Sequence, residues 1–426
     1  MDKRFEGLPF VPADILLPKD CEYSKWSVAP CDQYTSQPEY WQRVEEYVGS
    51  APSALRLILP ESCLEGPDVE TDIMDVNNTM TRYLREGRFR TLPDAMIYVE
   101  RTLSGGRTRR GLLGMVDLEQ YDYEPGSGTL IRGTEGTVLS RIPPRVAVRK
   151  NAPIELPHAM LLADDPDRTI MDPLTAARDD LEVLYDFDLM EQGGHVKGWL
   201  LGDREKAAVA SALRALADPA AFRLRYGSGS GAPLLFAVGD GNHSLATAKE
   251  CYERQKRLTP PERWDSLPAR YAMCELVNLH DQSLEFRPIH RVLFGVEPDD
   301  VIRQLLVAFP GAHLGPGEGH SLSFVHRDGA GVVTVPHPTS RLPVGTLQPF
   351  LDDYAINHRC RMDYIHGADV ARELAARPGN LAFLMPAMDK ERLFSIILHD
   401  GVLPRKTFSM GEANEKRFYL EARKIR

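Results

Sequence analysis

The sharpest pattern of apolar and polar positions lies at residues 234–252. The apolar run 234–238 predicts a buried strand. Gly239, Asp240 and Gly241 follow it and predict a tight turn, because glycine adopts such backbone conformations at little steric cost. Apolar residues then recur at helical spacing as far as Tyr252, with Asn242 as the expected N-cap. The segment therefore predicts a strand, a glycine turn and a helix.

Similar patterns along the rest of the chain predict both helices and strands. Helical spacing predicts helices at residues 38–48, 73–86, 207–217, 301–308, 346–357, 370–376, 390–399 and 412–423. Short apolar or alternating runs predict strands at 55–59, 95–102, 110–117, 271–279, 321–325, 331–335 and 381–384, with 103–109 as a hairpin loop. Residues 129–175 look irregular, and 226–233 reads as a flexible turn.

These elements predict an α/β or α+β fold in two parts. A mixed-sheet domain with the strand–turn–helix segment is expected over residues 1–295, and a smaller α/β subdomain over 296–426. A chain of 426 residues is long enough for such a division.

Composition narrows the class of partner. The net charge of −10 argues against a protein whose main partner is nucleic acid or an anionic membrane. No apolar run approaches the roughly 18 residues that a membrane span needs. The six cysteines are scattered without metal spacing, which predicts reduced thiols and a cytoplasmic location.

The glycine turn is the first candidate site. A helix start presents unpaired N–H groups and the positive end of the helix dipole, which together favour a phosphate. His243 is expected to donate to that anion, and Asp240 to hold a metal or act as a base. The alternative is a structural turn in which Asp240 and Asn242 only cap helix amides.

An arginine-rich stretch at residues 129–149 is the second candidate. Arginine forks suit phosphate oxygens, so Arg132 is a candidate phosphate ligand. Glu135, between Thr134 and Gly136, is a candidate for orienting a nucleophile or binding a metal. The alternative is a solvated charged loop.

Two further segments carry candidate substrate or phosphate ligands. Asp32 and Gln33 lie in the loop APCDQYTS, where Asp32 reads either as a catalytic carboxylate or as an ordinary turn residue. Arg287, His290 and Arg291 follow a predicted strand, a position that often binds ligands in α/β folds but that also suits a simple ion-pair cluster.

Several motifs in a fixed order resemble one family. WSVAPCDQYTS, LRLILPE, IRGTEGT, AVGDGNHSLATAK, LEFRPIHR and MDYIHG together resemble the longer members of the domain of unknown function 1015 family. That family's Asp-Gly-His-His-Arg motif is similar to the phosphate-binding segment of the ParB–sulfiredoxin superfamily, which includes a kinase of free serine. The resemblance implies a nucleotide with its phosphates at the helix start.

The resemblance can be carried over residue by residue. Asp240 and Gly241 match the motif, Asn242 stands in place of its first histidine, and His243 matches the second. Ser244 replaces the arginine, so Arg132, Arg141 or Arg291 is expected to supply the missing charge. The catalytic cysteine of sulfiredoxin would fall at Asn242, which disfavours sulfenic-acid repair.

The sequence thus predicts a magnesium-dependent phosphotransferase of the free-serine-kinase type, which uses ATP or ADP and acts on a small hydroxylated metabolite. Two alternatives stay open: a nucleotide-binding regulatory protein of ParB type, and a metabolite-binding protein without catalysis. The expected site residues are catalytic Asp240 (also the metal ligand), Glu135 and His243; nucleotide-binding Gly239, Gly241, Asn242, Ser244, Arg132, Arg287 and Arg291; and substrate-binding Asp32, Gln33 and His290.

Overall fold

The chain divides into two compact units. The computed structural model describes residues 2–35, 37–64, 66–103, 105–124, 126–137, 139–227 and 232–426. Unit 1 comprises Met1–Leu284 and Glu412–Arg426, and unit 2 comprises Glu285–Gly411. The expected division at 295/296 differs from this one in two places: residues 286–294 form a strand in the sheet of unit 2, and the C-terminal segment returns to unit 1. Residues 228–231 of the expected flexible turn lie outside the described residues.

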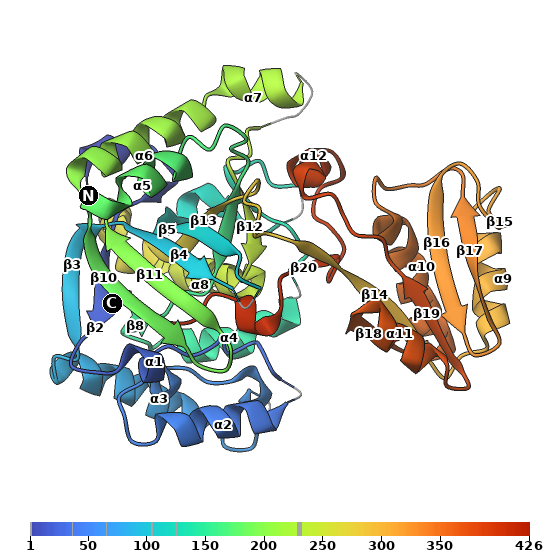
Figure 1. Ribbon diagram of the computed structural model, residues 1–426, viewed down its shortest axis with the longest axis horizontal. Coiled ribbons are helices and arrows are strands. Elements are labelled where there is room, and N and C mark those ends of the chain that lie inside the picture. Colours follow the sequence, from blue (N-terminus) through green and yellow to red (C-terminus); the bar gives the residue numbers. More distant parts are fainter. Residues whose placement is uncertain are drawn as a thin grey trace. The chain divides into compact units, whose positions relative to one another are not determined.

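A large mixed sheet forms the centre of unit 1 (Figure 1). Its strands, in spatial order, are β10 (Glu182–Leu189), β11 (Gly194–Leu200), β4 (Ile97–Thr102), β5 (Thr108–Asp117), β13 (Tyr271–Asn278), β9 (Met160–Ala163), β12 (Phe236–Asp240), β7 (Ile131–Gly133) and β6 (Tyr121–Asp122), and β1 (Phe10–Val11) pairs with β5. The β4–β5 hairpin expected from the sequence is confirmed. Pairing is parallel for β13–β9, β12–β7 and β7–β6, so the sheet is mixed as predicted.

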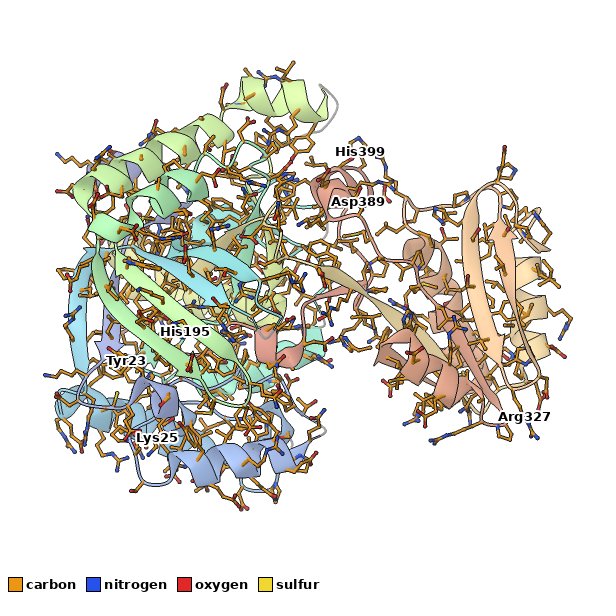
Figure 2. The ribbon with its side chains drawn as sticks, in the orientation of Figure 1. Tyr23, Lys25, His195, Arg327, Asp389 and His399 are labelled. Atoms are coloured by element: carbon orange, nitrogen blue, oxygen red, sulfur yellow. The ribbon has the colours of Figure 1, made fainter. Side chains whose placement is uncertain are left out.

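Successive side chains of a strand point to opposite faces of the sheet, and in this sheet both faces are apolar. On β4, Ile97 and Val99 belong to one hydrophobic cluster, while Met96 and Tyr98, just before and within the strand, belong to another. The first cluster includes α1 (Tyr23–Trp26), α2 (Pro38–Val48), α3 (Val69–Arg85) and the C-terminal segment, and the second includes α5 (Met171–Ala177), α6 (Asp203–Leu216) and α8 (Asn242–Arg257). Tyr23 of α1, labelled in Figure 2, packs against Phe187 of β10 with ring centroids 5.4 Å apart. The sheet is therefore covered on both sides.

Most predicted elements of unit 1 are present, with some differences. Helix α2 has its predicted bounds, and α3 begins four residues before the predicted start at 73. The predicted strand at 55–59 is wrong: Ala54–Leu57 form a 3-10 helix, because Ser53 caps the Leu55 amide. The expected irregular stretch 129–175 contains β7, α4 (Ile142–Arg149), β8 (Ile154–Glu155), β9 and α5. Helix α7 (Pro219–Tyr226) and the pairs β2 (Ala13–Pro18) with β3 (Phe89–Ala95) and β8 with β21 (Arg423–Lys424) complete the unit.

The C-terminal segment 412–426 is extended rather than helical, so the predicted helix at 412–423 is wrong. A 3-10 turn at Ala413–Glu415 is followed by extended backbone that ends in β21. The Trp26 side chain donates to Leu420 O at 2.9 Å, and Leu16 and Ala422 pair through their backbones. Residues 415–423 are all buried, charged and apolar alike, so the segment runs as an extended chain through the interior of unit 1.

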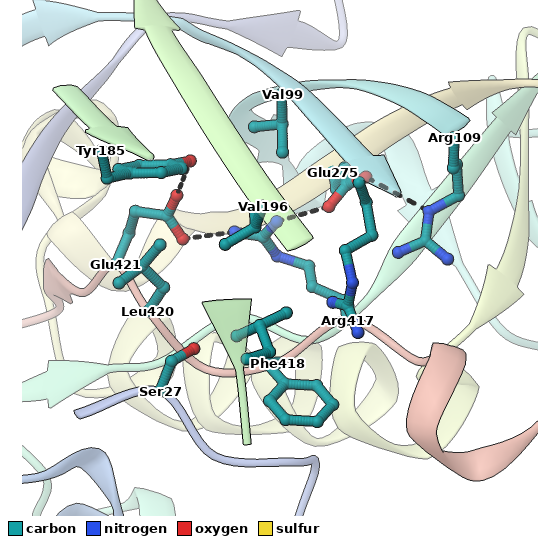
Figure 3. Close-up of a pocket in the computed structure, with 12 residues that line it drawn as sticks. Ser27, Val99, Arg109, Tyr185, Val196, Glu275, Arg417, Phe418, Leu420 and Glu421 are labelled. Carbon is teal, nitrogen blue, oxygen red and sulfur yellow. Dashed lines mark hydrogen bonds and ion pairs between the residues drawn. The ribbon is translucent and has the colours of Figure 1, made fainter. Parts of the chain in front are cut away.

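Arg417 fastens this segment inside unit 1 (Figure 3). Its guanidinium forms ion pairs with Glu275 of β13 and with Glu421, and all three side chains are buried. Tyr185 donates to Glu421 at 2.6 Å, and Arg109 Nε lies 3.7 Å from Glu275 Oε1. Burial alone would raise the pKa of Glu275, but Arg417 and Arg109 outweigh it and hold that pKa below its ordinary value. The network surrounds a cavity of about 20 Å³, enough for one water molecule.

Unit 2 is a smaller α/β part built on an antiparallel sheet. Its strands run in the order β15 (His313–Leu314), β17 (Gly329–Val335), β16 (His320–His326), β19 (Asn380–Leu384), β14 (Phe286–Phe294) and β18 (Arg361–His366), and β20 (Phe408–Met410) pairs with β14. Its helices are α9 (Pro298–Ala308), α10 (Pro343–His358), α11 (Ala368–Ala375) and α12 (Leu393–Asp400). The helices and strands predicted between 301 and 399 are therefore confirmed with small shifts of their ends.

Two expectations from composition can be compared with the structure. All six cysteines are free thiols, as predicted. Among the described residues, no helix combines the length and the apolar character that crossing a membrane requires.

Replacement of Arg417 by Met is expected to destabilise unit 1 strongly. The change leaves Glu421 and much of the charge of Glu275 buried without a counter-ion, which typically costs about 3–5 kcal/mol. Urea unfolding at neutral pH measures this loss. Lys424→Met, at an exposed position of the same segment, is the matched control and should unfold like the parent protein.

The pH dependence of the free energy of unfolding gives a second test of the Arg417→Met substitution. The Glu275 pKa is depressed in the folded parent, so the stabilisation from this pairing is present above the unfolded pKa of about 4.3 and is lost as the pH falls through the folded pKa. Without Arg417 the Glu275 pKa rises, so mild acid neutralises the side chain. The deficit of Arg417→Met should therefore be smaller at pH 5 than at pH 7, and an equal deficit at both would contradict a buried charge network.

Candidate functional site

The turn between β12 and α8 has the geometry of an anion site. Gly241 has φ +78°, in the left-handed region, and precedes the first turn of α8. A Cβ at this position would lie 2.8 Å from Ala159 Cα, so only glycine fits without a shift of the backbone. The first amides of the helix follow at Asn242, His243 and Ser244, where N–H groups have no acceptor within the helix. The turn thus places a helix start directly at the end of β12.

Asn242 is not the N-cap that the sequence predicted. Gly241 occupies that position, and Asn242 is the first residue of the helix. Its side chain instead bonds the neighbouring loop: Oδ1 accepts from Thr134 N at 3.2 Å, and Nδ2 donates to Thr134 Oγ1 at 3.2 Å and to Val238 O at 3.3 Å. Thr134 Oγ1 donates to Val238 O at 2.7 Å. Asn242 therefore joins the IRGTEGT segment to the glycine turn.

Strand β7 brings Glu135 to the same edge of the sheet as Asp240. The two strands are parallel, and Gly133 pairs with Val238. The β7 ladder ends at Gly133 and the chain bends at Thr134 before it reaches Glu135, whereas β12 continues to Asp240. The parallel pairing therefore brings the segments that carry these two residues, about a hundred positions apart in the sequence, to the same end of two neighbouring strands.

Asp240 has an ionic partner that the sequence analysis missed. Lys416 Nζ lies 3.0 Å from Asp240 Oδ2, and Asp240 Oδ1 accepts from the Gly241 amide at 2.9 Å. The Lys416 side chain is only 9% exposed. A buried ammonium group therefore stands beside the helix start, supplied by the C-terminal segment.

The loop with Asp32 and Gln33 is linked to the back of the turn. Tyr419 Oη lies 2.9 Å from His158 Nδ1 and donates to Cys31 Sγ at 3.2 Å. His158 directly precedes Ala159, the residue that lies against Gly241. Gln33 Nε2 donates to Asp32 Oδ1 at 3.1 Å within the loop. A continuous path of contacts therefore joins the N-terminal loop, the C-terminal segment and the turn.

Cys31 in that loop does not have the properties of a nucleophile. Burial, with a smaller contribution from Asp32, raises the pKa of the Cys31 thiol to about 12. The thiol is therefore protonated at neutral pH, as is expected for a structural cysteine.

The structure places Arg132 away from the phosphate turn. Its guanidinium donates to Thr129 O at 2.8 Å, Ala232 O at 2.7 Å and Pro233 O at 3.1 Å. These carbonyls lie before β7 and β12, whereas the turn follows β12. Burial lowers the pKa of Arg132. Arg132 therefore joins the chain segments that precede β7 and β12, at the end of these strands opposite the turn. The prediction that it binds phosphate is wrong, and its role here is structural.

Arg291 and His290 serve the core of unit 2, and Arg287 also lies there. Arg291 is fully buried, donates to Gln348 Oε1 at 2.8 Å and to Arg405 O at 3.1 Å, and stacks on Tyr364. His290 Nδ1 accepts from the Met385 amide at 3.0 Å. Arg287 is half-buried, with Nη2 3.5 Å from Glu285 Oε2. The contacts described for these three residues lie within unit 2.

The described side chains offer few groups that could bind a metal ion without a bound nucleotide. Within the residues that the structure describes, no group of three or more His, Cys, Asp or Glu side chains could hold a metal ion. Mg²⁺ in phosphotransferases is usually held by one or two carboxylates together with substrate phosphates. Asp240, the last residue of β12, and Glu135, two residues after β7, are carboxylates of the type that such a site uses.

Four residues at or behind the turn were missed from the sequence: Thr134, His158, Lys416 and Tyr419. Thr134 stood in the IRGTEGT motif, next to Glu135. Lys416 and Tyr419 lie in a segment that helical spacing predicts as a helix, and its sequence carries no alternation that indicates an extended chain. His158 had no pattern of its own that would have indicated it.

Comparisons with known proteins identify a family. No curated protein matches this sequence. Among solved structures, the chain is similar to a free serine kinase in complex with AMP, with 11% identity, a TM-score of 0.38, and 73% of this chain and 90% of that chain covered. It is also similar to a C-terminally truncated SbnI from Staphylococcus aureus, with 9% identity, a TM-score of 0.37, and 70% and 82% covered. A conserved hypothetical protein from Pyrococcus furiosus shows 10% identity, a TM-score of 0.35, and 72% and 90% covered.

The family model described as "Protein of unknown function (DUF1015)" matches residues 15–354. The matched region contains the N-terminal loop, the IRGTEGT segment and the whole glycine turn, but not the C-terminal segment that carries Lys416. Since the match spans most of the chain, this protein belongs to the DUF1015 family.

Proposed function

We propose that this chain is a nucleotide-dependent phosphotransferase that acts on a small hydroxylated metabolite. The observation that carries the proposal is the ion pair between the buried Lys416 and the partly buried Asp240 at the start of α8. Helix amides and an ammonium group attract an anion. The adjacent carboxylate could hold a metal ion or accept a proton, the two tasks that a carboxylate has in phosphoryl transfer.

The nucleotide phosphates are assigned to the start of α8. The backbone amides of Asn242, His243 and Ser244, and the side chains of His243 and Ser244, would hold the phosphate oxygens. Lys416 would add the positive charge that Ser244 does not provide. Asn242 acts through its bonds to Thr134, which set the position of the turn, and its side chain is not assigned a phosphate.

The two carboxylates are assigned different tasks. Asp240, bonded to Lys416 and to the Gly241 amide, is oriented by both and is the candidate for a metal ligand or a base. Glu135 is the candidate for orienting the acceptor hydroxyl. A magnesium ion bound by these carboxylates and the nucleotide would neutralise phosphate charge.

The acceptor is assigned to the side of the turn that faces the N-terminal loop. The contacts of Tyr419 with His158 and Cys31 support this assignment, since they fix the loop relative to the turn. Asp32 and Gln33 carry the polar groups that a hydroxylated metabolite would need.

Incubation with ATP or ADP, Mg²⁺ and a panel of hydroxy amino acids and polyols tests the proposal. A phosphorylated product supports it. Loss of nucleotide without such a product would replace it with a nucleotide-dependent switch. Binding of a metabolite alone, without use of nucleotide, would replace it with a metabolite-binding protein.

Replacement of Gly241 by Val is expected to abolish nucleotide binding. The left-handed backbone and the contact with Ala159 leave no room for the new side chain, so the helix start must shift. Calorimetric titration with ADP measures the loss. Gly87→Val is the matched control, because Gly87 also has a positive φ, +67°, but a Cβ added there would meet no atom within 4 Å. Unchanged ADP affinity in folded Gly241→Val would remove this turn as the site.

Changes at Lys416 and Asp240 should separate binding from turnover. Lys416→Met should weaken ADP binding by about tenfold, equivalent to about 1.4 kcal/mol, because one phosphate contact is lost. Asp240→Asn should lower turnover by roughly a hundredfold or more with a smaller effect on ADP affinity.

Lys424→Met removes one charge from the same segment at an exposed position and should leave both quantities unchanged. If Lys416→Met binds ADP like the parent while its melting temperature falls, the lysine is a structural partner of Asp240 and not a phosphate ligand.

A further inference from the structure

A hollow of about 410 Å³ lies entirely within unit 2. Its volume falls in the range of roughly 300–1,000 Å³ that is typical of small-molecule sites. The side chains that matter for its chemistry are His320, Ser321 and Ser323 of β16, Arg372 of α11, and Leu384 and Met385 at the end of β19.

The hollow exists because α11 covers only part of one sheet face. Val325 of β16 lies in the apolar cluster under this helix, paired with Ala382. Ser321 and Ser323 share the face of Val325 by the two-residue period, and Ser323 pairs with Leu384. Hydroxyl groups thus replace the apolar cover at this end of the sheet.

The charge of the hollow is positive. Within the described part of the chain, the Arg372 guanidinium forms no hydrogen bond or ion pair, and the residues that line the hollow include no Asp or Glu. Burial lowers the pKa of His320, and Arg392 adds to the effect; burial likewise lowers the pKa of His290, with contributions from Arg291 and Arg372. Nearby guanidinium groups therefore help to keep both histidines neutral in this part of unit 2.

Hydrogen bonds anchor two of the residues that line the hollow. His320 Nδ1 lies 2.9 Å from Thr346 Oγ1 of α10, which orients the ring. The Met385 amide donates to the buried His290 at 3.0 Å, which anchors the chain after β19. His290, predicted from the sequence as a substrate ligand, thus supports this hollow from the core.

We propose that this hollow binds a small organic anion, whose carboxylate or phosphate group pairs with Arg372 and accepts hydrogen bonds from Ser321 and Ser323. A guanidinium fork suits either group. Leu384 and Met385 offer an apolar wall for the carbon part of the ligand. The proposal is independent of the nucleotide site in unit 1, because every residue that it uses belongs to unit 2.

The NMR signal of the His320 ring in the full chain tests the proposal at the site itself. The signal is assigned by its absence in His320→Gln. Inorganic phosphate and succinate are titrated separately at constant ionic strength. Binding of either anion next to the ring should raise the pKa of His320 by roughly half a unit or more, about threefold in proton affinity. A response to only one of the two anions identifies the preferred group and supports the site.

Arg372→Gln should weaken the response by about tenfold or more in anion affinity. Arg377→Gln is the control, since Arg377 is exposed just after α11 and does not line the hollow. The proposal is overturned if neither anion moves the His320 pKa, or if Arg372→Gln responds like the parent. The measured quantity is the pKa of His320 alone, so phosphate binding at the turn in unit 1 does not count as a response in this experiment.

Discussion

The buried Arg417, between Glu275 and Glu421, is the interaction on which the site depends. The chain leaves unit 1 after Leu284 and returns at Glu412. The returning segment has little regular structure of its own, so it is held by side chains that insert into the unit. Three charges taken out of water tolerate only a narrow range of arrangements, because each must meet its partner closely. Arg417 thereby fixes the register of the segment.

That register sets the chemistry of the neighbouring positions. Lys416, one residue before Arg417, meets Asp240 at the glycine turn. Tyr419, two residues after it, meets His158 and Cys31. Side chains from one short stretch thus contact the glycine turn and the N-terminal loop. The family model ends at residue 354, before this segment.

The sequence predicted correctly those helices, strands and turns that depend on residues close together in the chain. The strand, the turn and α8 followed from an apolar run, two glycines and a helical period. All three are present, but the strand is shifted to Phe236–Asp240, so Gly239 and Asp240 belong to the strand and Gly241 alone makes the turn. The mixed sheet and the helices of unit 2 were predicted for the same reason. The segments of Glu135 and Asp240 reach the same end of the sheet only through the parallel pairing of β7 with β12, which spacing alone does not reveal.

The errors arise where distant partners override local preference. Residues 412–423 contain good helix formers, yet burial on several sides favours the extended form. Arg132 and Arg291 were assigned to phosphate because arginines suit it, but backbone carbonyls and Gln348 bind their guanidinium groups. Composition indicates which chemistry a side chain can perform, and only the fold decides which partner it meets.

A crystal structure of the full chain with ADP and Mg²⁺ is the most direct test of the central claim. We predict that the phosphates bind at the first turn of α8, within hydrogen-bond distance of the Asn242–Ser244 amides and of Lys416 Nζ. Nucleotide bound elsewhere in unit 1, or phosphates without contact to the α8 start, would contradict the account.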